Sequence, residues 1–208
     1  MPSKFRLRRI FRPLIKILAK ALSKIGVTPN IATCLMLAFS FLSFFFLVIL
    51  SNLFLFSIFV FITGIFDGVD GEIARLTDKT STFGGFFDSL MDRISEFIIF
   101  LALLIYCWDN ILWNFIDVKI VILISFIASL MISYLRAKAE GIYKGDFDFG
   151  LMARSERLFY IFISMLLTSF LGYIDELLFV FMILVLATSF YRYFKINKSI
   201  TNYISEKN

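Results

Sequence analysis

Long apolar runs separated by short polar segments dominate the chain from position 31 onward. Each run is close to the roughly 20 residues that a helix needs to cross the hydrocarbon core of a bilayer. Between the first two runs only Ser51 and Asn52 are clearly polar, which predicts a tight antiparallel hairpin. The pattern predicts an all-α integral membrane protein with six transmembrane helices, at about Ile31–Leu50, Leu53–Arg75, Gly84–Cys107, Val118–Gly141, Arg154–Leu171 and Glu176–Phe194.

The first 26 residues follow a different pattern. Between Lys4 and Lys24 apolar side chains recur at helical spacing, and Lys and Arg occupy the remaining face. Such a segment is typical of an amphipathic helix in the headgroup plane, attracted to anionic lipid. A signal peptide is the competing interpretation, but the charges run through the whole segment and no cleavage site follows. We therefore expect one domain over residues 1–208, with an amphipathic helix at 1–26, a six-helix bundle at 31–194 and a cytoplasmic tail at 195–208.

The composition agrees with a membrane protein and restricts its chemistry. Hydrophobic residues make up 60% of the chain and 28 residues are Phe, which is too apolar for a surface that faces water. Histidine is absent, which excludes an imidazole base, a Ser/His triad and a His-ligated zinc. Cys34 and Cys107 lie inside apolar runs and indicate neither a disulfide framework nor a metal pair.

The basic residues indicate an orientation in the membrane. If both termini are cytoplasmic, all of the 21 Lys and Arg except Lys119 fall on the cytoplasmic side or at the adjoining helix ends. The net charge of +5 then reflects topology, and we expect no nucleic-acid partner. The distribution predicts a multi-pass protein of the cell membrane whose second and third helices meet at the cytoplasmic side.

An acidic segment interrupts the apolar pattern at that meeting point. Two sets of residues share a helical face: Asp67, Asp70, Gly71, Ala74 and Arg75 at the end of the second helix, and Gly84, Asp88 and Asp92 at the start of the third. A short connection makes the two helices antiparallel neighbours, so we expect the four carboxylates to converge. Like charges in a partly dry place repel one another unless a cation lies between them. Oxygen ligands without Cys or His favour Mg²⁺ or Mn²⁺, with room for two ions, and paired metals suggest phosphoryl transfer.

The small and basic residues of this segment suggest a phosphate-bearing ligand. Gly71 and Gly84 remove side chains beside the carboxylates, which lets a flat or phosphate-bearing ligand approach the backbone. Arg75 can pair with a phosphate oxygen. The alternative for the glycines is close packing of membrane helices, where small residues are common.

The spacing D-x2-D-G-x2-A-R-x8-G-x3-D-x3-D, from Asp67 to Asp92, resembles the complete signature of the CDP-alcohol phosphotransferase family. The resemblance implies that an alcohol attacks the lipid-side phosphorus of a CDP-linked lipid, CDP-diacylglycerol or CDP-archaeol, and releases CMP. It also implies a homodimer, and it implies that Asp92 contacts a metal and is the general base. Spacing alone does not identify the base. The remaining roles implied are metal ligands at Asp67, Asp70 and Asp88, and CDP-lipid contacts at Asn30, Asp70, Gly71, Ala74, Arg75 and Gly84.

The acceptor must be inferred from the fourth and fifth helices. Ser133 and Arg136 lie near the end of the fourth helix, and Arg154 and Arg157 share a face of the fifth. These four residues could form a phosphate pocket, although flanking basic residues are also explained by topology. The segments SYLRAKAE and ARSERL are similar to patterns of the inositol-phosphate branch of the family, with Ala153 where that branch often has Glu.

That resemblance implies inositol phosphate as the acceptor. Glycerol 3-phosphate is the alternative, because it also requires a phosphate pocket, and an unphosphorylated alcohol such as serine ranks third. From another class, a divalent-cation transporter could use the same aspartates for permeation. It would need polar residues that continue to the far side of the membrane, whereas the far halves of all six predicted helices are apolar.

Overall fold

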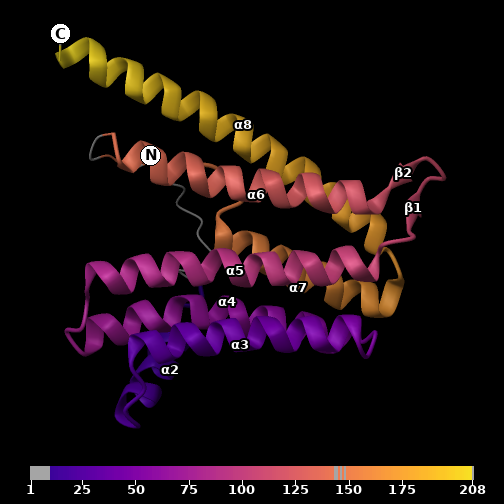
Figure 1. Ribbon diagram of the computed structural model, residues 1–208, viewed down its shortest axis with the longest axis horizontal. Helices are drawn as coiled ribbons and strands as arrows, with labels where there is room; N and C mark the ends of the chain where they lie inside the picture. Colours follow the sequence, from indigo (N-terminus) through magenta and orange to yellow (C-terminus); the bar gives the residue numbers. More distant parts are fainter. Residues whose placement is uncertain (1–9, 143–144, 146, 148, 208) are drawn as a thin grey trace.

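The computed structural model describes residues 10–142, 145, 147 and 149–207. The chain is almost entirely helical (Figure 1). A two-stranded antiparallel hairpin between α5 and α6 is the addition to the predicted all-α architecture in the described part of the chain. The elements are α2 (Arg12–Lys24), α3 (Pro29–Val48), α4 (Leu53–Leu76), α5 (Thr82–Tyr106), β1 (Ile111–Leu112), β2 (Ile116–Asp117), α6 (Val118–Glu140), α7 (Arg154–Leu171) and α8 (Ile174–Lys207).

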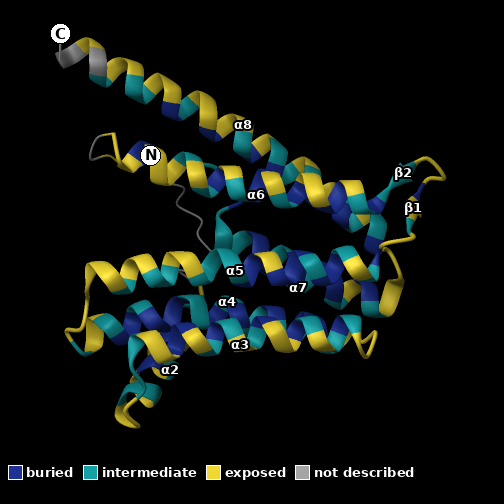
Figure 2. Cartoon of the chain, in the orientation of Figure 1, coloured by how far each residue is buried: buried dark blue, intermediate teal, exposed yellow. Residues whose placement is uncertain are grey.

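The helices from α3 to α7 begin and end within about two residues of the predicted spans. Four of the described helices, α3, α4, α6 and α8 as far as Tyr203, are long and apolar enough to cross a membrane. Many large apolar side chains are exposed. Figure 2 shows the buried residues on the helix faces turned toward neighbouring helices. The protein is therefore an integral membrane protein. Helices α5 and α7 are not among these four because they carry too many charged residues. These are Asp88, Asp92, Arg93 and Glu96 in α5, and Arg154, Glu156 and Arg157 in α7.

Polar side chains fix the starts of the helices around the acidic segment. Asn52 caps α4 by accepting a hydrogen bond from the Leu55 N–H at 2.9 Å, and Ser51 has a positive φ of 49°. The tight hairpin predicted at these two residues is present. Ser81 caps α5 in the same way, accepting from the Gly84 N–H at 3.0 Å.

Helix α3 packs against both α4 and α5, whereas α4 and α5 touch each other little. We expected α4 and α5 to be direct neighbours, and this is the main difference from the predicted arrangement. The reason lies in the buried face of α3, where the small side chains of Ala32, Thr33, Ser40 and Ser43 allow two helices to approach closely. As a result, space remains between the ends of α4 and α5 that carry the acidic residues.

Helix α2 packs along α4 beside the acidic segment. Ile15 and Ala19 are buried in a cluster with Ile65, Val69 and other α4 residues. A Cβ on Gly68 would lie 2.8 Å from the Ile15 Cδ1, so glycine lets the Ile15 side chain pack directly on α4. Positions 1–9 of the predicted amphipathic helix lie outside the described residues, as does Lys144.

Helix α8 continues beyond the predicted end at Phe194, so the segment predicted as a tail is helical as far as Lys207. It has no Pro or Gly to stop it, and Ile196 packs with Ala139 and Phe147. Within α8, the guanidinium of the buried Arg192 donates to the carbonyls of Phe149 and Ile132 at 2.5–2.8 Å. Arg192 therefore holds α6 and the segment before α7 against α8.

Candidate active site

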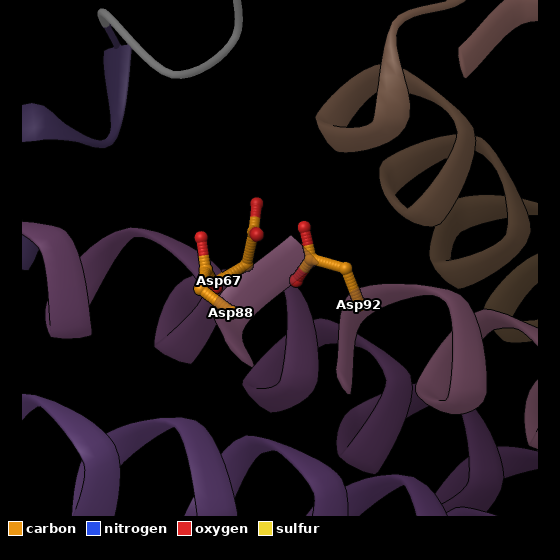
Figure 3. A group of neighbouring side chains, drawn as sticks. All are labelled: Asp67, Asp88 and Asp92. Carbon is orange, nitrogen blue, oxygen red and sulfur yellow. The ribbon is translucent and has the colours of Figure 1, made fainter. Parts of the chain in front are cut away.

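Three carboxylates converge at the ends of α4 and α5. One oxygen each from Asp67, Asp88 and Asp92 lies within 4.8 Å of the others, and Figure 3 shows the three side chains pointing into the same space. Asp88 and Asp92 are one helical turn apart on α5, so both face Asp67 on α4. Three oxygen donors without nitrogen or sulfur fit a hard divalent cation.

Asp70, which we expected to join this group, lies outside it. Its carboxylate accepts a hydrogen bond from Thr33 Oγ1 of α3 at 2.8 Å and one from the Gly71 N–H at 2.5 Å. Because α3 packs between the two helices, Thr33 holds Asp70 on the side of α4 that faces α3 and α5. Asp70 therefore borders a second space together with Asp88.

That space is a cavity of about 250 Å³ between α3, α4 and α5. We call it the donor-side cavity, because it contains the residues that the resemblance assigns to the CDP-lipid, the expected donor. A Cβ on Gly84 would lie 3.0 Å from Ser81 Oγ, so the absence of a side chain at Gly84 leaves more space in the cavity. Thr33 and Lys79 also line the cavity and were not predicted. All the residues that the sequence assigned to the CDP-lipid border it: Asn30, Asp70, Gly71, Ala74, Arg75 and Gly84.

On the other side of the carboxylates lies a cavity of about 400 Å³, the arginine cavity. It is bordered by residues of α4, α5, α6, α7 and α8. Asp88 lines both cavities, whereas Asp67 and Asp92 line the arginine cavity and Asp70 does not. The predicted acceptor residues Ser133, Arg136, Arg154 and Arg157 all line it, together with Arg93 and Arg192, which sequence reasoning attributed only to topology.

Arg154 lies directly against the carboxylate cluster. Its Nη1 donates to both Asp67 and Asp92. Its Nη2 donates to Ser95 Oγ at 2.8 Å and contacts Met36 Sδ at 3.5 Å. The side chain is 10% exposed, so this positive charge offsets the two carboxylates in a largely dry environment.

Arg157 makes a different set of contacts. Its guanidinium is buried and forms a bidentate pair with Glu96 of α5, with Nε–Oε1 at 2.7 Å and Nη2–Oε2 at 2.9 Å. Its Nη1 donates to the Met152 carbonyl at 3.1 Å. Glu96 was not predicted as a site residue, although a carboxylate in an apolar helix one turn after Asp92 requires a partner. The pair joins α5 to α7, the helices that carry Asp92 and Arg154.

The two residues from α6 are less constrained. Arg136 is half exposed and pairs with Glu140 at 2.8 Å. Ser133 Oγ donates to the Ser129 carbonyl at 3.4 Å, a long and weak bond. Both side chains line the arginine cavity, Arg136 while paired with Glu140.

These features define a class of protein: a helical membrane protein with a carboxylate metal-binding site between two polar cavities. Residues 26–191 match the sequence profile of CDP-alcohol phosphatidyltransferase. The chain therefore belongs to the CDP-alcohol phosphatidyltransferase family.

Individual relatives lie in the inositol-phosphate branch. The chain is 33% identical over 158 residues to the archaetidylinositol phosphate synthase of Pyrococcus horikoshii, covering 76% of this chain and 79% of that protein. It is 32% identical over 151 residues to the phosphatidylinositol phosphate synthase of Mycobacteroides abscessus, covering 73% and 67%.

Solved structures agree with this relationship. A crystal structure of phosphatidylinositol phosphate synthase from Mycobacterium tuberculosis with CDP-DAG bound superposes with a TM-score of 0.76 at 25% identity, covering 88% of this chain and 94% of that one. A second structure of that enzyme, in complex with manganese and citrate, gives a TM-score of 0.74 at 26% identity and covers 88% of each chain.

Proposed function

We propose that the protein transfers the lipid phosphoryl group of a CDP-linked lipid to a hydroxyl of inositol phosphate and releases CMP, as a step of phospholipid biosynthesis. The observation that carries this proposal is the position of the carboxylates between two cavities, one lined by the signature residues and the other by arginines. A nucleotide on one side and a phosphorylated alcohol on the other would meet at the carboxylates. The named relatives support the same reaction.

Asp67, Asp88 and Asp92 would hold a divalent cation, and their oxygen-only chemistry fits Mg²⁺ or Mn²⁺. We further propose two ions, with Asp70 and the shared Asp88 as ligands on the donor side. When bound, such ions neutralise phosphate charge and polarise the phosphoryl group.

Among the carboxylates, Asp92 is the best candidate for the general base on the acceptor hydroxyl. A base must contact the acceptor, and Asp67 and Asp92 both line the arginine cavity but not the donor-side cavity. Of these two, Asp92 is the residue that the resemblance to the family assigns to this role. Asp70 has the opposite location, which makes it unsuitable for this role.

For the donor we propose contacts from Asn30, Asp70, Gly71, Ala74, Arg75 and Gly84. Arg75 pairs with Glu72 at 2.6 Å and keeps an exposed guanidinium at the cavity edge, available for a phosphate. For the acceptor phosphate we propose Ser133, Arg136 and Arg154. Arg157 supports these residues through its pair with Glu96.

The test combines purified protein, Mg²⁺ and either CDP-diacylglycerol or CDP-archaeol with a panel of acceptors, and measures CMP release. We expect the highest rate with inositol phosphate. Faster turnover with glycerol 3-phosphate would favour that acceptor instead, and no CMP with any alcohol would refute the enzymatic proposal.

We also propose that all six helices from α3 to α8 cross the membrane as one domain, with α2 at the interface and with the site and both termini cytoplasmic. The charges of α5 and α7 pair inside the bundle, which makes spanning compatible with their composition. Labelling of single cysteines in intact cells tests the orientation, and cross-linking in membranes tests the homodimer expected for the family. A cysteine near Lys198 that an impermeant reagent labels from outside the cell would contradict this topology.

A divalent-cation transporter is the proposal from a different class. The arginines beside the carboxylates oppose it, because they would repel a cation that leaves the site. Uptake of Mn²⁺ into proteoliposomes distinguishes the two, and we expect none above protein-free vesicles.

A further inference from the structure

Arg154 binds two of the three carboxylates that a divalent cation would require. Its Nη1 donates to Asp67 and Asp92, two of the three converging carboxylates. A guanidinium and a metal ion both need the lone pairs of these oxygens, and two cations at contact distance in a largely buried site repel strongly. The contacts of Arg154 with both carboxylates are therefore incompatible with full metal ligation by the same atoms.

The guanidinium is held at the carboxylates imperfectly. Its Nη2 has Ser95 Oγ at 2.8 Å and the weak acceptor Met36 Sδ at 3.5 Å. The buried Nε has no hydrogen-bond partner, and such a group lowers the stability of the arrangement that contains it. On its other side Arg154 lines the arginine cavity, where a phosphate would accept two parallel hydrogen bonds from the fork of the guanidinium.

We propose that Arg154 alternates between two anions: it neutralises Asp67 and Asp92 until a divalent cation binds them, and it then turns into the arginine cavity to bind the acceptor phosphate. This inference rests on the proposed function. Because each equilibrium linkage is reciprocal, phosphate in the cavity strengthens metal binding and metal strengthens phosphate binding. Arg154 is thus a positioning residue for the metal as well as a ligand for the acceptor.

The direct test measures Mn²⁺ binding by electron paramagnetic resonance in the absence of any phosphate. We expect Arg154→Met to bind Mn²⁺ about tenfold more tightly than the wild type, because the competing cation is gone. Arg136→Met is the matched control, since it removes one positive charge from the same cavity but pairs with Glu140. We expect the control to change the affinity by less than about twofold, because an exposed charge is well screened.

A second variant keeps every charge in place. Ser95→Ala removes the hydrogen bond that Arg154 Nη2 donates at the carboxylates, so it weakens the hold on the guanidinium. We expect about threefold tighter Mn²⁺ binding, the effect of one ordinary hydrogen bond. This small substitution decides the question even if Arg154→Met does not fold.

The coupling itself is tested with inorganic phosphate as the probe. In the wild type, saturating phosphate should tighten Mn²⁺ binding about threefold, and in Arg154→Met it should have no effect. Three outcomes would each overturn the inference. The affinity for Mn²⁺ could rise equally in Arg154→Met and Arg136→Met, or it could stay unchanged in Ser95→Ala. The third such outcome is a wild type whose Mn²⁺ affinity does not respond to phosphate. None of these measurements involves turnover, so a failure of CMP release in the acceptor panel is distinguished from a failure here.

Discussion

The buried pair of Glu96 and Arg157 offers the sharpest test of how α7 is held against α5. Both side chains are almost completely buried, and the guanidinium is satisfied by the Glu96 carboxylate and the Met152 carbonyl. Replacing Glu96 by Met leaves the buried Arg157 without a charged partner. Replacing Arg157 by Met leaves the buried Glu96 with only the more distant Arg93, at 3.7 Å. We expect each single substitution to lower the free energy of unfolding by about 3–5 kcal/mol.

The double substitution is expected to behave differently. With Met at both positions no charge remains buried, and two flexible apolar side chains fill a similar volume. Apolar replacement of a buried ion pair is often neutral, so the double variant should be more stable than either single variant, with a coupling energy of about 3 kcal/mol or more.

Unfolding in detergent, followed by the fluorescence of Trp108 and Trp113, measures these energies, provided that it is reversible. Single effects that simply add in the double variant would refute the assignment of the pair as a coupled unit. The KM for inositol phosphate adds a second criterion. If Arg157 bound the acceptor phosphate directly, Arg157→Met alone would raise that KM, whereas a supporting role through Glu96 predicts similar changes in both single variants.

Four further predictions concern the reaction and its scaffold. Asp92→Asn should lower kcat by about 10²–10⁴-fold with unchanged binding of the CDP-lipid, and wild-type CMP release would exclude Asp92 as the base. Chelation should abolish CMP release and Mg²⁺ or Mn²⁺ should restore it; activity that persists in chelator would refute metal dependence. Gly84→Val should raise the KM for the CDP-lipid about tenfold, since its side chain would meet Ser81, and an equal rise for the acceptor would contradict this. Arg192→Met should lower the free energy of unfolding by about 2–4 kcal/mol because its bonds to two carbonyls are lost. Lys198→Met, at an exposed position, is the control. Equal effects of the two substitutions would refute the proposal that Arg192 holds α6 against α8.

The sequence predicted best what depends on local geometry. Helix positions follow from the length of the apolar runs. The predicted residues of the donor-side cavity, except Asn30, lie on shared helix faces at fixed spacing, so little tertiary information was needed to predict that they are close together. The convergence of Asp67, Asp88 and Asp92 was predicted for the same reason.

Contacts between distant segments were not predictable in this way. Thr33 lies 37 residues from Asp70, and the packing of α3 between α4 and α5 places Asp70 beside the donor-side cavity with Asp88, outside the group of Asp67, Asp88 and Asp92. Glu96 lies 61 residues from Arg157, and nothing in either segment identifies its partner. The positive-inside rule already offered an explanation for Arg192, so nothing in the sequence suggested its contacts with two carbonyls. The low hydropathy of α5 and α7 likewise gives no sign that several of their charged side chains pair inside the bundle.

The separation of the donor-side and arginine cavities by a wall that contains Asp88 has an evolutionary consequence. The surfaces that would recognise the two substrates share few residues, so mutations in α6 and α7 can alter the choice of headgroup without disturbing the nucleotide half. A gene duplicate of such an enzyme could acquire a new polar alcohol through a handful of substitutions. The scaffold is therefore suited to diversification of membrane lipids, because the surface for the headgroup can change while the surface for the nucleotide stays the same.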